Sequence, residues 1–455
     1  MDNIGITEEE ASFKDPDAKV FIENGIYVRK IFKRYIPEYK KLINSGLYND
    51  LISKNLLIKH EETKIEDNCI TIKPEQVFIS YPWEWCFSQL KDAALTTLKI
   101  QQIALDYNMS LKDANCFNIQ FLNNKPLLID TSSFETYIEG QPWVAYKQFC
   151  ENFIAPLALM AYSDLSLNKL FLMNINGIPL ELTSKLLPFK TKFNLNLFTH
   201  IHLHSKMQNK YSENSHKMSN IKIDKQQLKN IIKNLQTTVE NINLQKYKTE
   251  WENYYSFTNY TEKSFDEKYN IIDKYRSIIS PKNVWDFGSN TGIFSRIFSK
   301  SNSNVTAFDI DPMAIEKNYL KIKKDNENNI FPLVFDLANP SPALGWANKE
   351  RKNLLQRAQN IDLILALALI HHLRFTYNIP FENMAKYFCS ISKYLIIEFV
   401  DKNDSKVQKM LLNRKDIFDD YTQENFENIF GNYYKILYKN KIPDTERTLY
   451  LMEKK

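Results

Sequence analysis

The sequence predicts a C-terminal α/β domain built on a mostly parallel sheet, preceded by an α+β accessory domain. The chain has 455 residues, enough for two or three domains, and its 44% hydrophobic share can fill their cores. From Lys282 onward, short apolar runs alternate with helical stretches, the pattern of a parallel sheet covered by helices. We expect an accessory domain over residues 1–205, a linker and helical connector over 206–250, and the α/β domain over 251–455.

The α/β half contains seven candidate strands. Five are short apolar runs separated by helical segments, and the last two, near the C-terminus, are expected to form an antiparallel hairpin. The predicted strands cover residues 283–287, 305–309, 330–335, 361–367, 394–400, about 433–438 and 447–452.

A glycine-containing loop follows the first of these strands. It reads D-x-G-x-N-x-G, with Asp286, Gly288, Asn290 and Gly292 at the defined positions. Glycine tolerates positive φ and lets the backbone approach a ligand, and the helix that follows offers free N–H groups. The loop lacks the G-x-G-x-x-G spacing that holds a dinucleotide pyrophosphate, which argues against an NAD site.

Three acidic residues end successive strands of the predicted sheet. Asp286 ends the first apolar run, Asp309 the second and Asp336 the third. Carboxyl ends of parallel strands share the edge at which open α/β folds bind ligands. A lone acid at a strand end is commonly a helix cap, but three in register with a glycine loop indicate a binding site.

The loop and the acids together resemble class I S-adenosylmethionine (SAM) methyltransferases over about residues 251–455. The resemblance implies a Rossmann-like seven-stranded sheet and SAM as cofactor. The whole chain, including 81–85 and 129–135, also resembles a bacterial family of long class I methyltransferases, some labelled nodulation proteins. For the site, the resemblance implies Asp286, Gly288, Asn290 and Gly292 around the methionine part, Asp309 at the ribose and Asp336 at the adenine.

Two neighbouring histidines follow the fourth strand, where they could face the transferred methyl group. His371 or His372 could remove a proton from an acceptor near neutral pH. The alternative is that one histidine packs in the core and the other caps a turn. The acceptor, an O or N nucleophile, is not identified by the sequence.

The accessory domain resembles a stripped protein-kinase lobe. Asp113 and Asn118 have the D-x-x-x-x-N spacing of a kinase catalytic loop, Asp130 ends a strand as the magnesium-binding Asp does, and Arg29 lies on an upstream basic strand. No glycine-rich loop precedes that strand, and Thr131 replaces the Phe that kinases place after this Asp. The alternative is that Asp113 and Asn118 cap a turn.

Other features carry weaker expectations. On a strand, His200, His202 and His204 would share one face, but no acidic or Cys partner lies nearby, so no metal site is predicted. The alternative is that this stretch is a partly exposed strand or the start of a helix. The aromatic stretch 251–260 could cover a cofactor or pack in the core. Five cysteines without C-x-x-C spacing, no signal peptide and no long apolar run favour a cytoplasmic protein.

The function expected from the sequence is methyl transfer from SAM to an unidentified O or N acceptor. Two alternatives stay open: a SAM-sensing protein without catalysis, and a kinase-like phosphotransferase in the N-terminal half. The net charge of +5 neither requires nor excludes nucleic acid as a partner.

Overall fold

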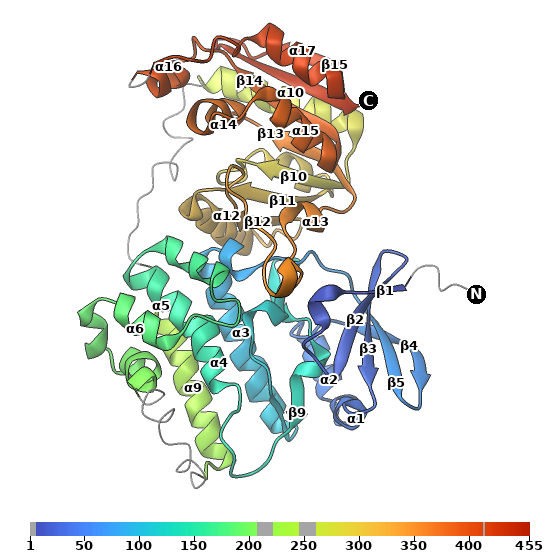
Figure 1. The fold of residues 1–455 in the computed structure, drawn as a ribbon, viewed down its shortest axis with the longest axis vertical. Helices are drawn as coiled ribbons and strands as arrows, with labels where there is room; N and C mark the ends of the chain where they lie inside the picture. The colour runs from blue at the N-terminus through green and yellow to red at the C-terminus, as the bar shows by residue number, and fades with distance from the viewer. Residues whose placement is uncertain (1–5, 207–221, 245–260, 413–414) are drawn as a thin grey trace. The chain divides into compact units, whose positions relative to one another are not determined.

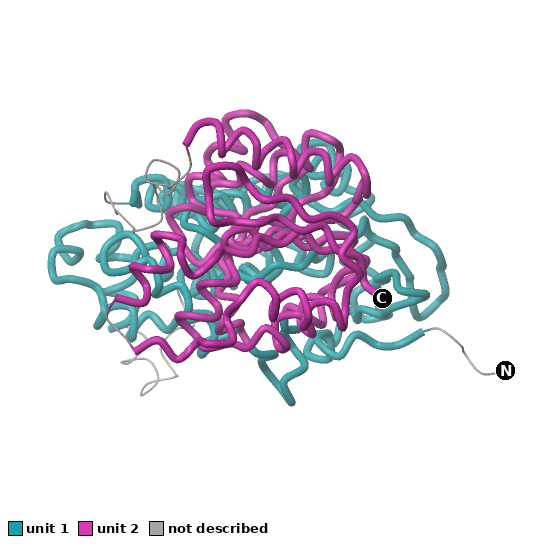
Figure 2. Tube along the Cα trace, turned by 90° about the horizontal axis from the view of Figure 1, so that it is seen from above, with its two compact units in different colours: residues 1–247, 342–353 teal, residues 248–341, 354–455 magenta. Residues whose placement is uncertain are grey.

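The computed structural model describes residues 6–206, 222–244, 261–412 and 415–455 (Figure 1). The chain divides into two compact units, coloured separately in Figure 2. Unit 1 comprises residues 1–247 together with 342–353, and unit 2 comprises 248–341 and 354–455. Residues 342–353 therefore belong to unit 1, although they interrupt unit 2 in the sequence. The boundaries expected from the sequence, 1–205, 206–250 and 251–455, stay predictions.

Unit 2 contains a seven-stranded sheet, which confirms the predicted fold class. The strand order is β12-β11-β10-β13-β14-β16-β15, and β16 runs antiparallel to both β14 and β15. Since the chain starts at the inner strand β10, builds outward to β12 and then returns to β13, a topological switch point lies between β10 and β13. The strands are β10 (Asn283–Phe287), β11 (Asn304–Asp309), β12 (Ile330–Val334), β13 (Ile361–Ala366), β14 (Ser392–Val400), β15 (Tyr434–Lys441) and β16 (Arg447–Lys454).

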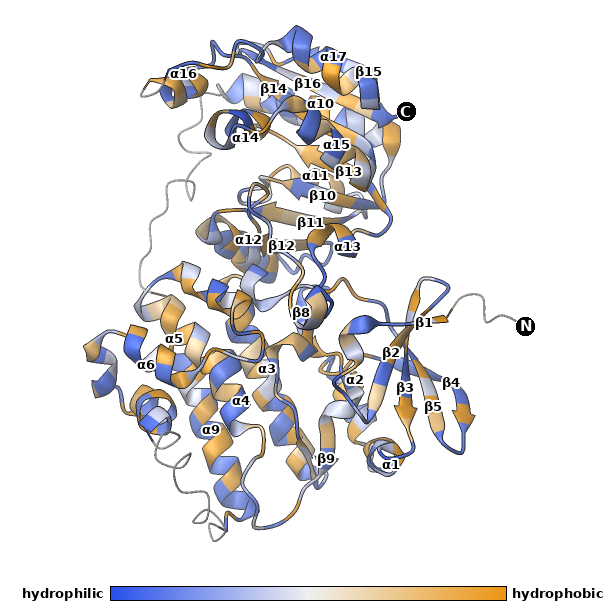
Figure 3. Ribbon diagram, in the orientation of Figure 1, coloured by the Kyte–Doolittle hydropathy of each residue, from blue (hydrophilic) through white to orange (hydrophobic). Residues whose placement is uncertain are grey.

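Most residues of the central strands are buried, on both faces of the sheet. Figure 3 colours the residues by hydropathy, and many residues of these strands are apolar. Val284 packs with α10 (Glu262–Ile279) and α11 (Ser295–Ser299) on one face, and Phe287 on β10 contacts Phe388 of α15 (Phe381–Ile391) on the other. Strands buried on both sides read as continuous apolar runs, which is why the sequence showed them clearly. The remaining helices are α12 (Pro312–Asp325), α13 (Leu354–Arg357), α14 (Ile370–Tyr377), α16 (Ser405–Leu411) and α17 (Gln423–Tyr433).

Unit 1 combines a five-stranded antiparallel sheet with a largely helical part. The strand order is β1-β2-β3-β5-β4, and two short pairs, β6 with β9 and β7 with β8, lie further along the chain. The main helices are α1 (Ile36–Asn44), α2 (Leu47–Ser53), α3 (Phe87–Asp106), α5 (Ala155–Tyr162), α6 (Leu180–Leu186) and α9 (Lys225–Asn241). The strands are β1 (Ile6–Glu8), β2 (Ala18–Glu23), β3 (Ile26–Phe32), β4 (His60–Glu66), β5 (Cys69–Pro74), β6 (Met109–Leu111), β7 (Ile119–Leu122), β8 (Lys125–Leu128) and β9 (Phe134–Thr136).

The three clustered histidines of unit 1 lie in a helical segment, so the helix start considered for them is confirmed and the strand is wrong. Residues Phe198–Leu203 form a π-helical turn. His200 hydrogen-bonds to Tyr146 and Asn234, and His202 hydrogen-bonds to Ser184 and Thr191. Partners supplied from other helices bury these rings, and short-range alternation could not reveal those partners.

Two remaining predictions concern an aromatic stretch and membrane-spanning helices. The aromatic stretch 251–260 lies outside the described residues. Among the residues that are described, no helix has both the length and the apolar character needed to cross a bilayer.

Candidate cofactor and active site

The loop after β10 adopts the backbone that its glycines predict. Gly288, Asn290 and Gly292 have φ values of +78°, +50° and +76°. The amides of Gly288 and Ser289 both donate to the carbonyl of Phe308 on β11, 2.9 Å away. A Cβ atom at Gly292 would lie 2.6 Å from Asn318 Nδ2, so the Asn318 side chain would have to shift, and the positive φ itself favours glycine here.

Arg296, in the helix after the loop, holds the loop in place. One guanidinium nitrogen donates to the carbonyls of Thr291 and Gly292, at 2.7 and 3.0 Å. The rest of the group donates to Asn318 and to Glu327. Arg296 is only 7% exposed, and its planar guanidinium is fully paired, so it fixes the position of the loop.

The three predicted carboxylates take different local roles. Asp286 accepts a hydrogen bond of 2.6 Å from Ser295 Oγ. Asp309 accepts from the amides of Asn290 and Asp311, at 2.7 and 2.9 Å, and therefore ties the glycine loop to β11. Asp336 accepts from the two amides of the turn that follows it, at 2.9 and 3.1 Å.

Burial makes the first two carboxylates unusually basic. Desolvation raises the pKa of Asp286 to about 7, against a lowering by the Ser295 hydroxyl. Desolvation likewise raises the pKa of Asp309 to about 6, against the two backbone amides that favour its charge. Two acids with shifted pKa values beside one cavity indicate a functional site.

A cavity at the carboxyl edge of the sheet collects most of the predicted residues. Asp286, Gly288, Asn290, Asp309, Asp336 and His372 all line it, whereas Gly292 and His371 are not among its lining residues. Ser289 also lines the cavity, and its buried hydroxyl has no hydrogen-bond partner among the described residues. A cofactor with polar groups, such as SAM, fits this orphaned hydroxyl, the carboxylates and the glycine cradle.

The two histidines of α14 occupy different environments. His372 lines the cavity, while His371 is 2% exposed and its ring centroid lies 4.2 Å from that of His372. Desolvation, assisted by the positive charge of Arg447, lowers the pKa of His372 to about 4. Desolvation also lowers the pKa of His371 well below its usual value. Both rings are therefore neutral at pH 7, the state a proton acceptor requires.

The sequence reasoning missed Lys268, which lies in α10 and lines the same cavity. Its ammonium bonds to Glu398 Oε2 at 2.7 Å and lies 4.6 Å from the centre of the Phe294 ring. Glu398 also pairs with Arg447, whose guanidinium bonds to Asp404. Among the described residues that line the cavity, Lys268 is the one Lys or Arg. The feature of the sequence that could have identified Lys268 is its place on the apolar side of an amphipathic helix.

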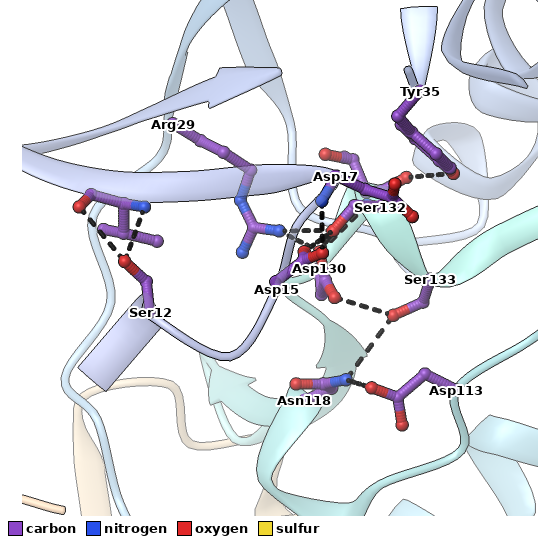
Figure 4. Close-up of polar contacts among 12 residues, drawn as sticks. Ser12, Asp15, Asp17, Arg29, Tyr35, Asp113, Asn118, Asp130, Ser132 and Ser133 are labelled. Carbon is purple, nitrogen blue, oxygen red and sulfur yellow. Dashed lines mark hydrogen bonds and ion pairs between the residues drawn. The ribbon is translucent and has the colours of Figure 1, made fainter. Parts of the chain in front are cut away.

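The kinase-like residues of unit 1 lie together, as Figure 4 shows. Arg29 on β3 forms an ion pair with Asp130 and also donates to Ser132 at 3.0 Å. Asn118 donates its amide N–H to Asp113 at 3.0 Å. Asn118 therefore contacts Asp113 directly, and Asp130 is paired with Arg29, all within unit 1.

Comparison with known proteins identifies the family. The chain is 33% identical over 462 residues to the nodulation protein NoeA of Rhizobium meliloti (strain 1021), covering 97% of this chain and 95% of that protein. The chain belongs to the family of NoeA. Residues 261–435 match the family described as Methyltransferase domain. The predicted resemblance to class I methyltransferases is confirmed, and the protein is a SAM-dependent methyltransferase.

Two solved structures match this chain at lower sequence identity. The N-methyltransferase NodS from Bradyrhizobium japonicum WM9 is 12% identical, covering 42% of this chain and 97% of NodS, with a TM-score of 0.31. The magnesium protoporphyrin IX methyltransferase ChlM from Synechocystis PCC 6803 with bound S-adenosylhomocysteine is 14% identical, covering 45% and 92%, with a TM-score of 0.33.

Proposed function

We propose that the protein transfers the SAM methyl group to an oxygen or nitrogen nucleophile that loses its proton to His372. The observation that supports this proposal is a neutral histidine on the wall of the cavity that also contains the glycine loop and three carboxylates. SAM supplies an electrophilic methyl group on a sulfonium. The chain's residues then need to hold the nucleophile in line with that group and accept its proton.

We assign the binding residues as follows. Gly288 and Asn290 shape the loop under the methionine part, with the Asp286 carboxylate beside it, and Asp309 and Asp336 accept hydrogen bonds from the ribose and the adenine amino group. When the acceptor attacks, its lone pair forms the bond to the methyl carbon and its proton passes to a ring nitrogen of His372. The electron pair of the broken carbon–sulfur bond remains on sulfur, which leaves S-adenosylhomocysteine.

We assign Lys268 to the carboxylate of the methionine part. That carboxylate requires a positive partner in a buried site, and the Lys268 ammonium is already oriented by Glu398. Lys268→Met should weaken SAM binding about 10- to 100-fold, since a charge-assisted hydrogen bond is worth roughly 1.5–3 kcal/mol. Calorimetry would compare the affinities for SAM and for 5′-methylthioadenosine. The second ligand lacks the carboxylate and should bind the variant nearly as well as it binds the wild type.

Lys268→Arg is the matched variant, because it keeps a charge next to Glu398 and should retain more SAM affinity than Lys268→Met. Equal losses of SAM and 5′-methylthioadenosine affinity in Lys268→Met would show that the residue supports the fold instead of the carboxylate.

The affinity for S-adenosylhomocysteine should depend on pH in the free protein. The raised pKa values of Asp286 and Asp309, about 7 and about 6, mean that both acids gain protons as the pH falls from 8 to 6. Because ligand hydroxyl and ammonium donors require carboxylates, affinity should fall on acidification, approaching tenfold per pH unit below the governing pKa. Titration calorimetry from pH 8 to pH 5.5 would measure this, and a flat profile would contradict it.

The proposed activity is tested by incubating the full chain with SAM labelled in the methyl group and an extract of cells from which the gene has been deleted. Label should enter an acid- or heat-stable acceptor with wild-type protein and not with Asp309→Ala. A SAM-sensing protein would bind the cofactor with the same affinity but transfer no label to any fraction.

A further inference from the structure

Unit 1 includes a segment that lies, in the sequence, between two strands of the methyltransferase sheet. Residues 342–353, here called the arm, follow β12 and precede β13. The arm closes on itself through two backbone hydrogen bonds between Leu344 and Arg351, 3.0 and 3.1 Å long. Glu350 accepts from the amide of Trp346 at 2.7 Å, which fixes the turn at the tip.

The base of the arm is held by an aromatic group in unit 1. The Arg351 guanidinium lies 4.2 Å from the centre of the Phe117 ring. The amide of Lys352 donates to the hydroxyl of Tyr81 at 2.7 Å, and the Tyr81 and Trp83 rings are 4.6 Å apart. A cation stacked on the face of a buried aromatic ring is attracted by the electron-rich face of that ring, so this contact attaches the arm to unit 1.

Charged side chains of the connection between β1 and β2 also hold the arm. Lys352 pairs with Glu9, and Glu350 pairs with Lys14 at 2.7 Å. Lys349 pairs with Glu10, but both of those side chains are more than half exposed, so this third pair should contribute little. Glu9, Glu10 and Lys14 all belong to the connection between β1 and β2.

If unit 1 follows the kinase resemblance predicted from the sequence, the two parts that hold the arm take the places of nucleotide-binding elements. In protein kinases a glycine-rich loop covers the phosphates, and the catalytic loop supplies an Asp and an Asn. Here the β1–β2 connection has no glycine and carries acidic residues, and Phe117 lies between Asp113 and Asn118. Ser132 donates to Asp15 of that connection at 2.9 Å, beside the Arg29–Asp130 pair (Figure 4).

We propose that unit 1 uses the β1–β2 connection and the segment around Phe117 to hold the arm, in place of a magnesium nucleotide, and thereby positions Asp336 for the adenine of SAM. Five residues separate Asp336 from the start of the arm at Pro342. A chain of that length spans at most about 20 Å, so anchoring the arm restricts the Asp336 turn. Arg351 and Lys352 are accordingly positioning residues. The inference rests on the proposed adenine contact of Asp336.

The test compares Arg351→Ala/Lys352→Ala with Lys349→Ala in the full chain. In the double variant, hydrogen exchange over residues 337–353 should accelerate, and the dissociation constant for S-adenosylhomocysteine should rise about three- to tenfold. S-inosylhomocysteine lacks the adenine amino group. The ratio of its dissociation constant to that of S-adenosylhomocysteine should become smaller in the double variant. Lys349→Ala should change none of these, because it removes an exposed pair. Wild-type protein should show no thermal stabilisation by magnesium ATP.

Each result decides a part of the proposal. Unchanged exchange in the double variant would show that the arm is not held by Arg351 and Lys352. Faster exchange with unchanged affinity and unchanged adenine preference would show that the arm does not position Asp336. Stabilisation of the wild type by magnesium ATP would contradict the replacement of a nucleotide by the arm. Failure of wild-type protein to bind S-adenosylhomocysteine would instead overturn the proposed function.

Discussion

Replacing His372 with alanine should lower turnover at saturating SAM by about a hundredfold or more, which is the usual contribution of a positioned general base. SAM affinity should change little, because proton removal concerns the acceptor. Since the pKa of His372 is about 4, turnover by the wild type should stay level on acidification until the pH approaches about 5, and then fall as the ring gains its proton. Initial rates with labelled SAM would measure both effects.

Two further variants separate the roles of the neighbouring rings. His372→Asn keeps hydrogen bonding but removes the titrating group, so its rate should stay low and lose the acidic fall. His371→Asn should act mainly on stability, because His371 is buried and does not line the cavity. Wild-type turnover in His372→Ala would show that positioning alone accounts for the chemistry.

Replacing Asp309 with alanine should weaken SAM and S-adenosylhomocysteine binding by a hundredfold or more. The carboxylate holds the amides of Asn290 and Asp311, and we expect it to accept hydrogen bonds from the ribose as well. Losing a charged acceptor costs roughly 1.5–3 kcal/mol per hydrogen bond, and the glycine loop loses its tie to β11 at the same time. Titration calorimetry with both ligands would measure the loss.

The matched comparison for Asp309 uses two other variants. Asp309→Asn retains one acceptor oxygen at nearly the same volume and should lose less affinity than Asp309→Ala. Asp325→Ala removes an exposed carboxylate on α12 that pairs with Lys321, and it should leave both affinities within about twofold of the wild type. Unchanged SAM affinity in Asp309→Ala would reject the assignment of β11 to the ribose.

The sheet and the cofactor loop could be predicted because their signals are local. Strands buried on both faces need unbroken apolar runs, and a loop that takes positive φ at Gly288 and Gly292 needs glycine. Asp286 and Asp309 could be placed at one edge because parallel strands share their carboxyl ends. Their shifted pKa values could not be predicted, since desolvation depends on what surrounds each carboxylate.

Local patterns along the chain were thus enough to predict the α/β class, the glycine loop and the edge at which the acids end their strands. Tertiary structure alone decided which histidine lines the cavity, since adjacent residues on a helix point about 100° apart. It also brought Lys268 to the cavity and seated Arg351 on Phe117 in unit 1. These pairings join residues far apart in the chain, and only the packing of whole elements sets their distance.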